Sequence, residues 1–264
     1  MFNPLGDTPS RRFELRKFAD EKTLADSVAE QWISDLEKTG NGAYFAALSG
    51  GRIARRFFQS IAGISGAFPR VLDRVHFFWA DERCVAPNHP ESNFGLAQDH
   101  LVSPLKLSTD RIHRIRGEIG GSESASEAEL DLRRLVPADP NGRCVLDMVF
   151  LGMGEDGHVA SLFPGVSDGS IQSSAMYRTV MATKPPPVRI TLTYEAIAAA
   201  RQVWILASGP NKEAALRNSL SPEGLTPLAK VLGIRQETVI FTDIRLPETG
   251  NFERIGGRRT RRSA

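Results

Sequence analysis

Residues 145–165 read VLDMVFLGMGEDGHVASLFPG, and this stretch carries the strongest signal for the fold. The apolar run Val145–Leu151 has the length of a buried strand, and glycines follow it at positions 152, 154 and 157. Glycines allow the backbone to bend sharply and to approach a ligand closely. The turn also holds Asp156 and His158, and histidine is the side chain best suited to move a proton near neutral pH. The stretch therefore predicts a strand with a candidate base at its carboxyl end.

Outward from this stretch, apolar segments of strand length alternate with segments of helical periodicity. In Thr23–Glu37, for example, an apolar residue recurs at every fourth position from Leu24 to Leu36. Such alternation predicts an α/β fold with an open, mostly parallel sheet and helices on both faces, a Rossmann-like, doubly wound arrangement. The expected strands are Tyr44–Leu48, Val75–Ala80, Val145–Leu151, Arg189–Thr193, Val203–Ala207 and Thr238–Phe241, and the expected helices are Thr23–Glu37, Ile53–Ile64, Ser124–Leu135, Tyr194–Ala200 and Lys212–Leu220.

The composition is that of an ordinary globular protein, with 264 residues of which 41% are hydrophobic and 24% charged. No apolar run approaches the ~20 residues of a membrane helix, and the first residues lack a signal-peptide pattern. The net charge is only +2 and the C-terminal arginines account for it, so no nucleic-acid-binding surface is expected. We expect a cytoplasmic protein without membrane or nucleic-acid partners, with one domain over residues 1–254 and a flexible Arg-rich tail over 255–264. The oligomeric state is left open.

Four of the expected strands end in turns rich in polar residues. These turns are Ser49–Gly51, Asp81–Arg83, the Asp156/His158 turn and Ser208–Lys212. Ligands of open α/β sheets bind beyond the carboxyl ends of the strands, so the four turns predict one site. Ser49, Gly50 and Gly51 precede a helix and suit an anion, although a tight turn needs the same residues. Lys184 and Arg189 flank a proline-rich loop and are either phosphate ligands or surface charges.

Two other kinds of site find little support in the residues. Gly152, Gly154 and Gly157 match the dinucleotide pattern G-x-G-x-x-G, which also needs an acidic residue about 20 positions further on. The sole acidic residue between Val159 and Tyr194 is Asp168, which comes too early. The two cysteines and five histidines lack the spacing of metal ligands, and there is no G-x-S-x-G nucleophile elbow. We therefore expect no metal site and no nicotinamide or flavin.

Several motifs together resemble the 6-phosphogluconolactonase family, which is related to the glucosamine-6-phosphate isomerases/deaminases. They run from LSGG at 48–51 through WADERCV at 79–85, HPESNFG at 89–95 and IHRIRGE at 112–118 to GMGEDGHVASLFP at 152–164 and KEA at 212–214. The deaminases carry Phe-Asn-Glu-Pro after Gly-His-x-Ala, whereas this chain has Ser161-Leu162-Phe163-Pro164. Arg83, where the deaminases usually have tyrosine, also favours the lactonase branch.

The resemblance implies hydrolysis of 6-phospho-D-glucono-1,5-lactone to 6-phosphogluconate, the second step of the oxidative pentose phosphate pathway, without a metal or organic cofactor. It makes His158 the general base, Asp156 the residue that orients or polarises the site, and Arg83 a partner of the oxyanion or of the sugar hydroxyls. The resulting candidates for binding the phosphosugar lactone are Ser49, Gly50, Gly51, Arg52, Asp81, Lys184 and Arg189.

One position departs from the family pattern. The family continues its glycine turn as Gly-Gly-Ser-Thr-Pro, whereas Arg52-Ile53-Ala54 follows Gly51 here. Arg52 can replace the missing hydroxyls with a bidentate contact to phosphate, or its presence can mean weaker phosphate binding or another substrate. Two alternatives therefore stay open: an aminosugar-phosphate isomerase/deaminase, and a non-catalytic sensor that binds a sugar phosphate.

Overall fold

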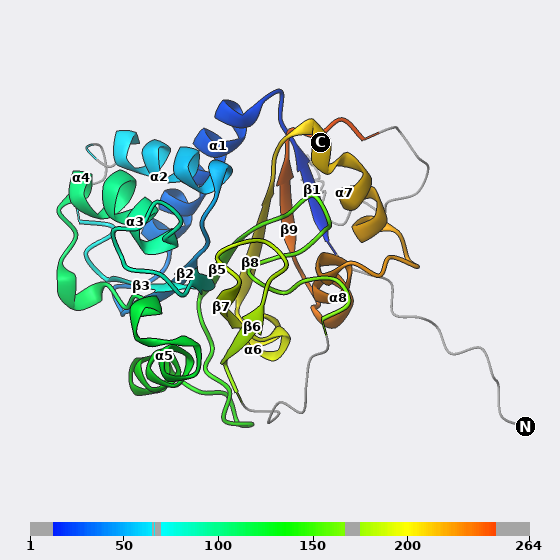
Figure 1. Ribbon diagram of the computed structural model, residues 1–264. Helices are drawn as coiled ribbons and strands as arrows, with labels where there is room; N and C mark the ends of the chain where they lie inside the picture. The colour runs from blue at the N-terminus through cyan, green and yellow to red at the C-terminus, as the bar shows by residue number, and fades with distance from the viewer. Residues whose placement is uncertain (1–12, 65, 67–69, 167–174, 247–264) are drawn as a thin grey trace, which may run out of the picture.

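The computed structural model describes residues 13–64, 66, 70–166 and 175–246 (Figure 1). Its main sheet has six strands in the order β1-β9-β8-β5-β2-β3, and each neighbouring pair is parallel. All five residues of the interior strand β2 are buried, as expected for a parallel strand covered on both faces. The predicted α/β fold is confirmed. The strands are β1 (Glu14–Lys17), β2 (Tyr44–Leu48), β3 (Val75–Trp79), β5 (Met148–Gly152), β8 (Gln202–Ala207) and β9 (Val239–Thr242).

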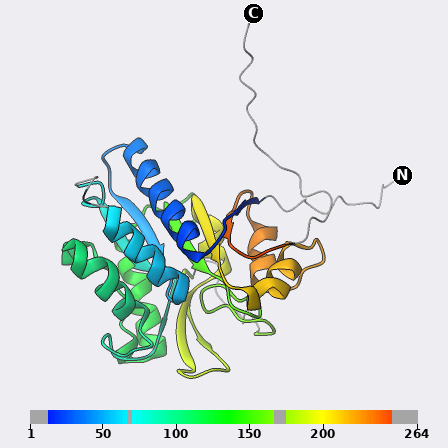
Figure 2. The same ribbon diagram turned by 90° about the horizontal axis from the view of Figure 1, so that it is seen from above.

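The two longest N-terminal helices, α1 (Glu21–Lys38) and α2 (Arg52–Ile64), run side by side (Figure 2). Trp32 of α1 packs against Phe57 of α2 and against Phe77 and Phe150 of the sheet, with ring centroids 5.1–6.3 Å apart. This aromatic cluster fixes both helices on the sheet, and with them the residues at their N-termini. The other α-helices are α3 (Asn93–Ala97), α4 (Ser103–Leu105), α5 (Gly121–Leu135), α6 (Tyr194–Ala199), α7 (Glu213–Leu220) and α8 (Pro227–Ile234).

A second, antiparallel sheet has the strand order β4-β7-β6. Its strands are β4 (Asp81–Arg83), β6 (Tyr177–Met181) and β7 (Val188–Leu192). The expectation that Asp81–Arg83 is a turn is therefore wrong, because these residues pair with β7. The strand predicted at Arg189–Thr193 exists one residue earlier and belongs to this sheet. Ala80 joins the two sheets, since its N–H donates to Leu48 O (2.7 Å) and its carbonyl accepts from Leu192 N (2.7 Å).

The expected domain boundary and tail are not tested by this structure, whereas its helices can be examined for membrane spans. The tail at 255–264 lies outside the described residues, so the single domain ending at residue 254 stays a prediction. Among the helices of the described part of the chain, none is both long and apolar enough to cross a membrane.

Candidate active site

The turn after β5 holds Asp156 and His158 in direct contact. Asp156 Oδ1 accepts from the His158 backbone N–H (3.1 Å) and lies 2.6 Å from His158 Nδ1. An ionised carboxylate can only accept, so Nδ1 carries the proton and Nε2 is left as the basic nitrogen. Gly157 makes the turn possible, with φ of +81° and Thr226 so near that a Cβ would lie 2.6 Å from its Cβ.

The carboxyl of Asp156 is held ionised by its neighbour. Partial burial raises its pKa. The backbone N–H, the charge and the ring N–H of His158 together lower it by more than burial raises it, so the pKa ends below its ordinary value. Asp156 is thus a hydrogen-bond acceptor throughout the neutral range. This pair has the geometry of an oriented general base.

Phe163 lies between His158 and Arg189, and Arg189 is paired in turn with Arg83. Its ring centroid lies 4.9 Å from that of His158, and the Arg189 guanidinium lies over the same ring at 5.8 Å. Arg189 on β7 is the cross-strand partner of Arg83 on β4. Burial and the charge of Arg83 lower the pKa of Arg189. Two like charges on paired strands favour an anionic ligand, and Phe163 lies between one of them, Arg189, and His158.

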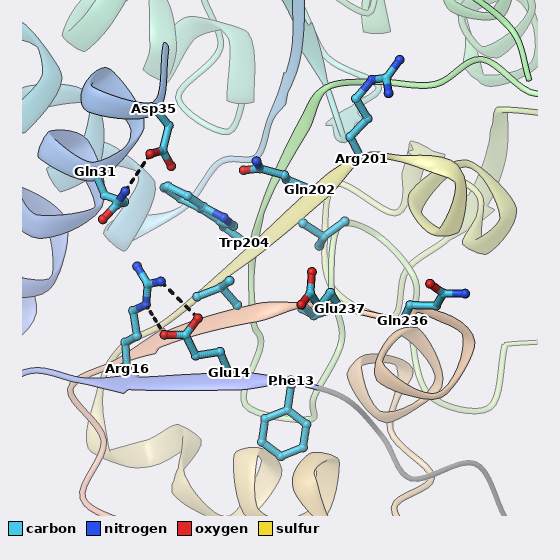
Figure 3. Close-up of a pocket in the computed structure, with 13 residues that line it drawn as sticks. Phe13, Glu14, Arg16, Gln31, Asp35, Arg201, Gln202, Trp204, Gln236 and Glu237 are labelled. Atoms are coloured by element: carbon cyan, nitrogen blue, oxygen red, sulfur yellow. Dashed lines mark hydrogen bonds and ion pairs between the residues drawn. The ribbon is translucent and has the colours of Figure 1, made fainter. Parts of the chain in front are cut away.

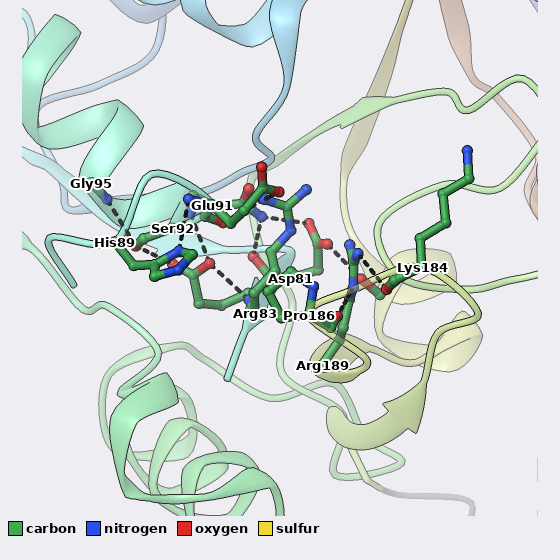
Figure 4. A network of polar contacts seen from close by, with 12 residues as sticks. Asp81, Arg83, His89, Glu91, Ser92, Gly95, Lys184, Pro186 and Arg189 are labelled. Atoms are coloured by element: carbon green, nitrogen blue, oxygen red, sulfur yellow. Dashed lines mark hydrogen bonds and ion pairs between the residues drawn. The ribbon is translucent and has the colours of Figure 1, made fainter. Parts of the chain in front are cut away.

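The backbone and side chains around Arg83 and Arg189 fix their positions (Figure 4). Arg83 Nη1 donates to the carbonyl of Glu91 and lies 3.4 Å from its carboxylate, while its buried Nε has no partner among the described residues. Arg189 donates to Pro186 O (3.1 Å) and to Lys184 O (3.5 Å). Lys184 therefore contributes its carbonyl to the network, and its exposed side chain extends away from Arg189 (Figure 4). A phosphate contact of Lys184 stays a prediction.

Asp81 links the predicted turns through a buried network that the sequence analysis did not contain. Its carboxylate accepts from Ser161 Oγ (2.6 Å) and from Asn93 Nδ2 (3.2 Å). Asn93 lies so close to Gly50 that a Cβ there would overlap its side-chain oxygen. Gly50 is thus a glycine because of Asn93. The network connects the glycine turn, β4 and the segment after His158.

Glu82 places Asn93. Glu82 is 2% exposed, and its carboxylate accepts from Asn93 N (2.7 Å), Phe94 N (2.7 Å), Arg83 N (2.8 Å) and Ser92 Oγ (3.1 Å). Burial raises its pKa, and the three backbone N–H groups oppose that shift. The sequence could not identify Asn93 as a site residue, because Ser-Asn in HPESNFG matches no catalytic or binding motif. Its contacts arise only when α3 packs beside β4.

A second group of cations lies at the glycine turn. Arg52, the first residue of α2, pairs with Glu21 (2.6 Å) and donates to Ser208 O (3.4 Å). Lys212 ends the loop that follows β8, and burial together with the charge of Arg52 lowers its pKa. The sequence places Lys212 in one of the four polar turns predicted to form the site, but indicates no role for its side chain. Ser49 is 7% exposed, and its hydroxyl has no hydrogen-bond partner within the described part of the chain.

The chain was compared with known proteins. The family profile described as glucosamine-6-phosphate isomerases/6-phosphogluconolactonase matches residues 19–240. The chain belongs to this family.

Relatives in the family agree with the lactonase branch. A protein of Arabidopsis thaliana described as probable 6-phosphogluconolactonase 1 is 35% identical over 73% of each chain. A 6-phosphogluconolactonase of Streptomyces coelicolor is 32% identical, with 83% of this chain and 86% of the relative covered. The crystal structure of a devB protein superimposes with a TM-score of 0.80 at 27% identity, covering 87% of this chain and 96% of that one. The expected family is confirmed, as is the expectation of an enzyme of the 6-phosphogluconolactonase type.

Two further features of the structure concern possible metal ligands and a cavity away from the candidate site. No three His, Cys, Asp or Glu side chains cluster as metal ligands within the described ranges. A cavity of about 490 Å³ lies at the amino ends of β8 and β9, between Trp204 and Asp35 (Figure 3). The candidate site lies at the opposite, carboxyl ends of the strands.

The relatives do not decide where in the cell this chain acts, so the cytoplasmic location stays a prediction.

Proposed function

We propose that the chain hydrolyses 6-phospho-D-glucono-1,5-lactone to 6-phospho-D-gluconate in the oxidative pentose phosphate pathway. The observation that carries the proposal is the Asp156–His158 pair, whose Nε2 has no hydrogen-bond partner among the described residues, with Arg189 on the other side of Phe163 and Arg83 paired with Arg189. The names of the curated relatives support the same substrate. A lactone is an activated ester, so a positioned base and a partner for the oxyanion are sufficient for its hydrolysis.

The reaction then runs through His158. Its Nε2 takes a proton from water as the water oxygen attacks the C1 carbonyl, and Asp156 stabilises the imidazolium that forms. We assign Arg83 to the carbonyl oxygen, which becomes an oxyanion in the tetrahedral intermediate. When the intermediate collapses, the bond between C1 and the ring oxygen breaks, and the imidazolium returns its proton to the leaving oxygen.

We assign the 6-phosphate to the turn Gly50–Gly51 and to Arg52, Lys212 and Arg189. Arg52 begins the helix after the glycine turn, and Lys212 is near enough for the charge of Arg52 to lower its pKa; Arg189, on β7, is assigned as a third cation. Guanidinium groups suit phosphate because they can donate two parallel hydrogen bonds. Arg52 would thereby take over the role of the hydroxyls that the family pattern has at this turn.

The deaminase alternative finds less support in the site. Ser161 follows Gly157-His158-Val159-Ala160, is fully buried and donates to Asp81. Phe163, two positions later, stands where the deaminase motif carries its glutamate, and its ring packs against His158, so the segment presents no carboxylate there. A sensor that only binds a sugar phosphate would not need the Asp156–His158 pair.

The test is the rate of 6-phosphogluconolactone hydrolysis above the spontaneous rate. We expect His158→Ala to lower kcat about 10²–10⁴-fold, the usual contribution of a positioned general base. His100→Ala is the matched control, because His100 lies on the helical segment after α3 and outside the site. Turnover that is normal in a folded His158→Ala variant would refute the assignment. Ammonia release from glucosamine 6-phosphate would indicate the deaminase, and binding of 6-phosphogluconate without turnover the sensor.

A further inference from the structure

Glu21 and Arg52 form an ion pair between the first residues of two neighbouring helices. Glu21 begins α1 and Arg52 begins α2, and their side chains meet at 2.6 Å between Oε2 and Nη1. The Arg52 side chain is 62% exposed, whereas that of Glu21 is 19% exposed. Solvent and ligands therefore reach the guanidinium more easily than the carboxylate.

The other end of the Arg52 guanidinium faces the loop after β8. Its Nη2 donates to Ser208 O (3.4 Å) and lies 2.7 Å from the place where a Cβ on Gly209 would be. Lys212 follows on the same loop and is close enough to Arg52 for the like charge to lower its pKa. Arg52 thus lies between Glu21 on one side and the loop of Lys212 on the other.

Glu21 differs from the other carboxylates near Lys212 in how it is held. Asp243 accepts from Ser208 Oγ (2.8 Å) and from Gly209 N (3.0 Å), and Glu155 accepts from Asn211. Those two acids are fixed by groups that bear no charge.

The carboxylate of Glu21, in contrast, is incompletely satisfied. Oε2 binds Arg52, while Oε1 is buried without a hydrogen-bond partner among the described residues. Arg52 is thus the single partner of this carboxylate among the described residues, and because the guanidinium is exposed, an anion from solvent can compete with Glu21 for it.

We propose that Glu21 is the counter-ion of Arg52 that the substrate's phosphate displaces, so that Glu21 limits the preference for the phosphorylated over the unphosphorylated lactone. The inference rests on the proposed function and on the assignment of the phosphate to Arg52. Carboxylate and phosphate compete for the same N–H groups, and a phosphate bound beside Glu21 is also repelled by its charge. The free enzyme thereby keeps its cation neutralised, at the cost of some affinity for phosphate.

The test is Glu21→Gln, which keeps the shape of the side chain and removes its charge. We expect KM for 6-phosphogluconolactone to fall about two- to fivefold, the range of an exposed ion pair. Inhibition by inorganic phosphate should tighten by a similar factor. The ratio of kcat/KM for phosphorylated to unphosphorylated gluconolactone should rise accordingly. Glu37→Gln is the matched control, with the same charge change near the far end of α1, about 24 Å along the helix.

Two outcomes would overturn the inference while the proposed function stands. If Glu21→Gln raises KM, Glu21 holds Arg52 in its binding position rather than competing for it. If KM and phosphate inhibition do not change, or change equally in Glu37→Gln, the ion pair has no role in recognition. Failure of the proposed function looks different, because the wild-type enzyme would then not accelerate lactone hydrolysis at all.

Discussion

The contact between Asp156 and His158 predicts how far two substitutions of the aspartate should differ. Both hydrogen bonds of the pair end on the same atom, since the backbone N–H and Nδ1 of His158 both reach Oδ1. Asparagine can keep both bonds by placing its carbonyl oxygen there. Asp156→Asn therefore removes the negative charge and leaves the orientation of the ring. Asp156→Ala removes both.

The expected losses follow from these contacts. A hydrogen bond to a charged acceptor is roughly twice as strong as a neutral one, so the asparagine variant loses about 1 kcal/mol, or about fivefold in kcat. The Asp156 side chain is 52% exposed, and screening by water keeps this figure low. The alanine variant also frees the ring and lets Nδ1 lose its proton, for an expected loss of about 10²–10³-fold.

Both rates can be measured from acid release with a pH indicator, after subtraction of the spontaneous hydrolysis of the lactone. Asp99→Asn is the control, since Asp99 is an exposed acid outside the site. Equal losses in the asparagine and alanine variants would mean that the charge itself is essential and that orientation is not the role of Asp156. Near-normal turnover of the alanine variant would remove Asp156 from the mechanism.

Three further predictions follow from contacts already described. Gly50→Ala would push the Asn93 side chain from its place and should lower the free energy of unfolding in urea by about 1–3 kcal/mol, whereas Gly42→Ala, with open space around it, should not. Arg52→Ala should raise KM for 6-phosphogluconolactone more than KM for unphosphorylated gluconolactone, and equal changes would argue against a phosphate contact. Burial and the charge of a neighbouring histidine lower the pKa of His113 from 6.5 to about 4. The contribution of neutral His113 to the free energy of unfolding is therefore fully present above pH 6.5 and falls by about 1–2 kcal/mol as the pH drops to 4. Calorimetric melting of His113→Gln should show a smaller loss over that range.

The parallel sheet could be predicted because its strands are continuous apolar runs. The strand predicted at Tyr44–Leu48 matches β2 residue for residue, since every side chain in it is buried. β1 was missed because an edge strand with the sequence ELRK has no apolar pattern. β4 was missed because its three charged residues read as a solvated turn. What buries them is β7, more than 100 positions later in the chain, and no local pattern can show that pairing.

The same distinction applies to the site. Asp156 and His158 could be paired from the sequence because they are neighbours in one turn. The contact between Arg83 and Arg189, the ion pair of Arg52 with Glu21, and the role of Asn93 depend on elements far apart in the chain. Contacts within one turn can be predicted from the spacing of a motif, whereas contacts between charged residues on distant elements depend on how those elements pack.

The pairing of β1 with β9 has a consequence for how the protein is made. Glu14 lies beside Val239, so the earliest of the described strands to be synthesised pairs with the latest of them. Until β9 is made, one edge of β8 keeps its backbone N–H and C=O groups unpaired, and such an edge can pair with strands of other chains. Ribosomes that stop before Val239 should therefore release chains that aggregate, even though every residue of the Asp156–His158 turn has already been made.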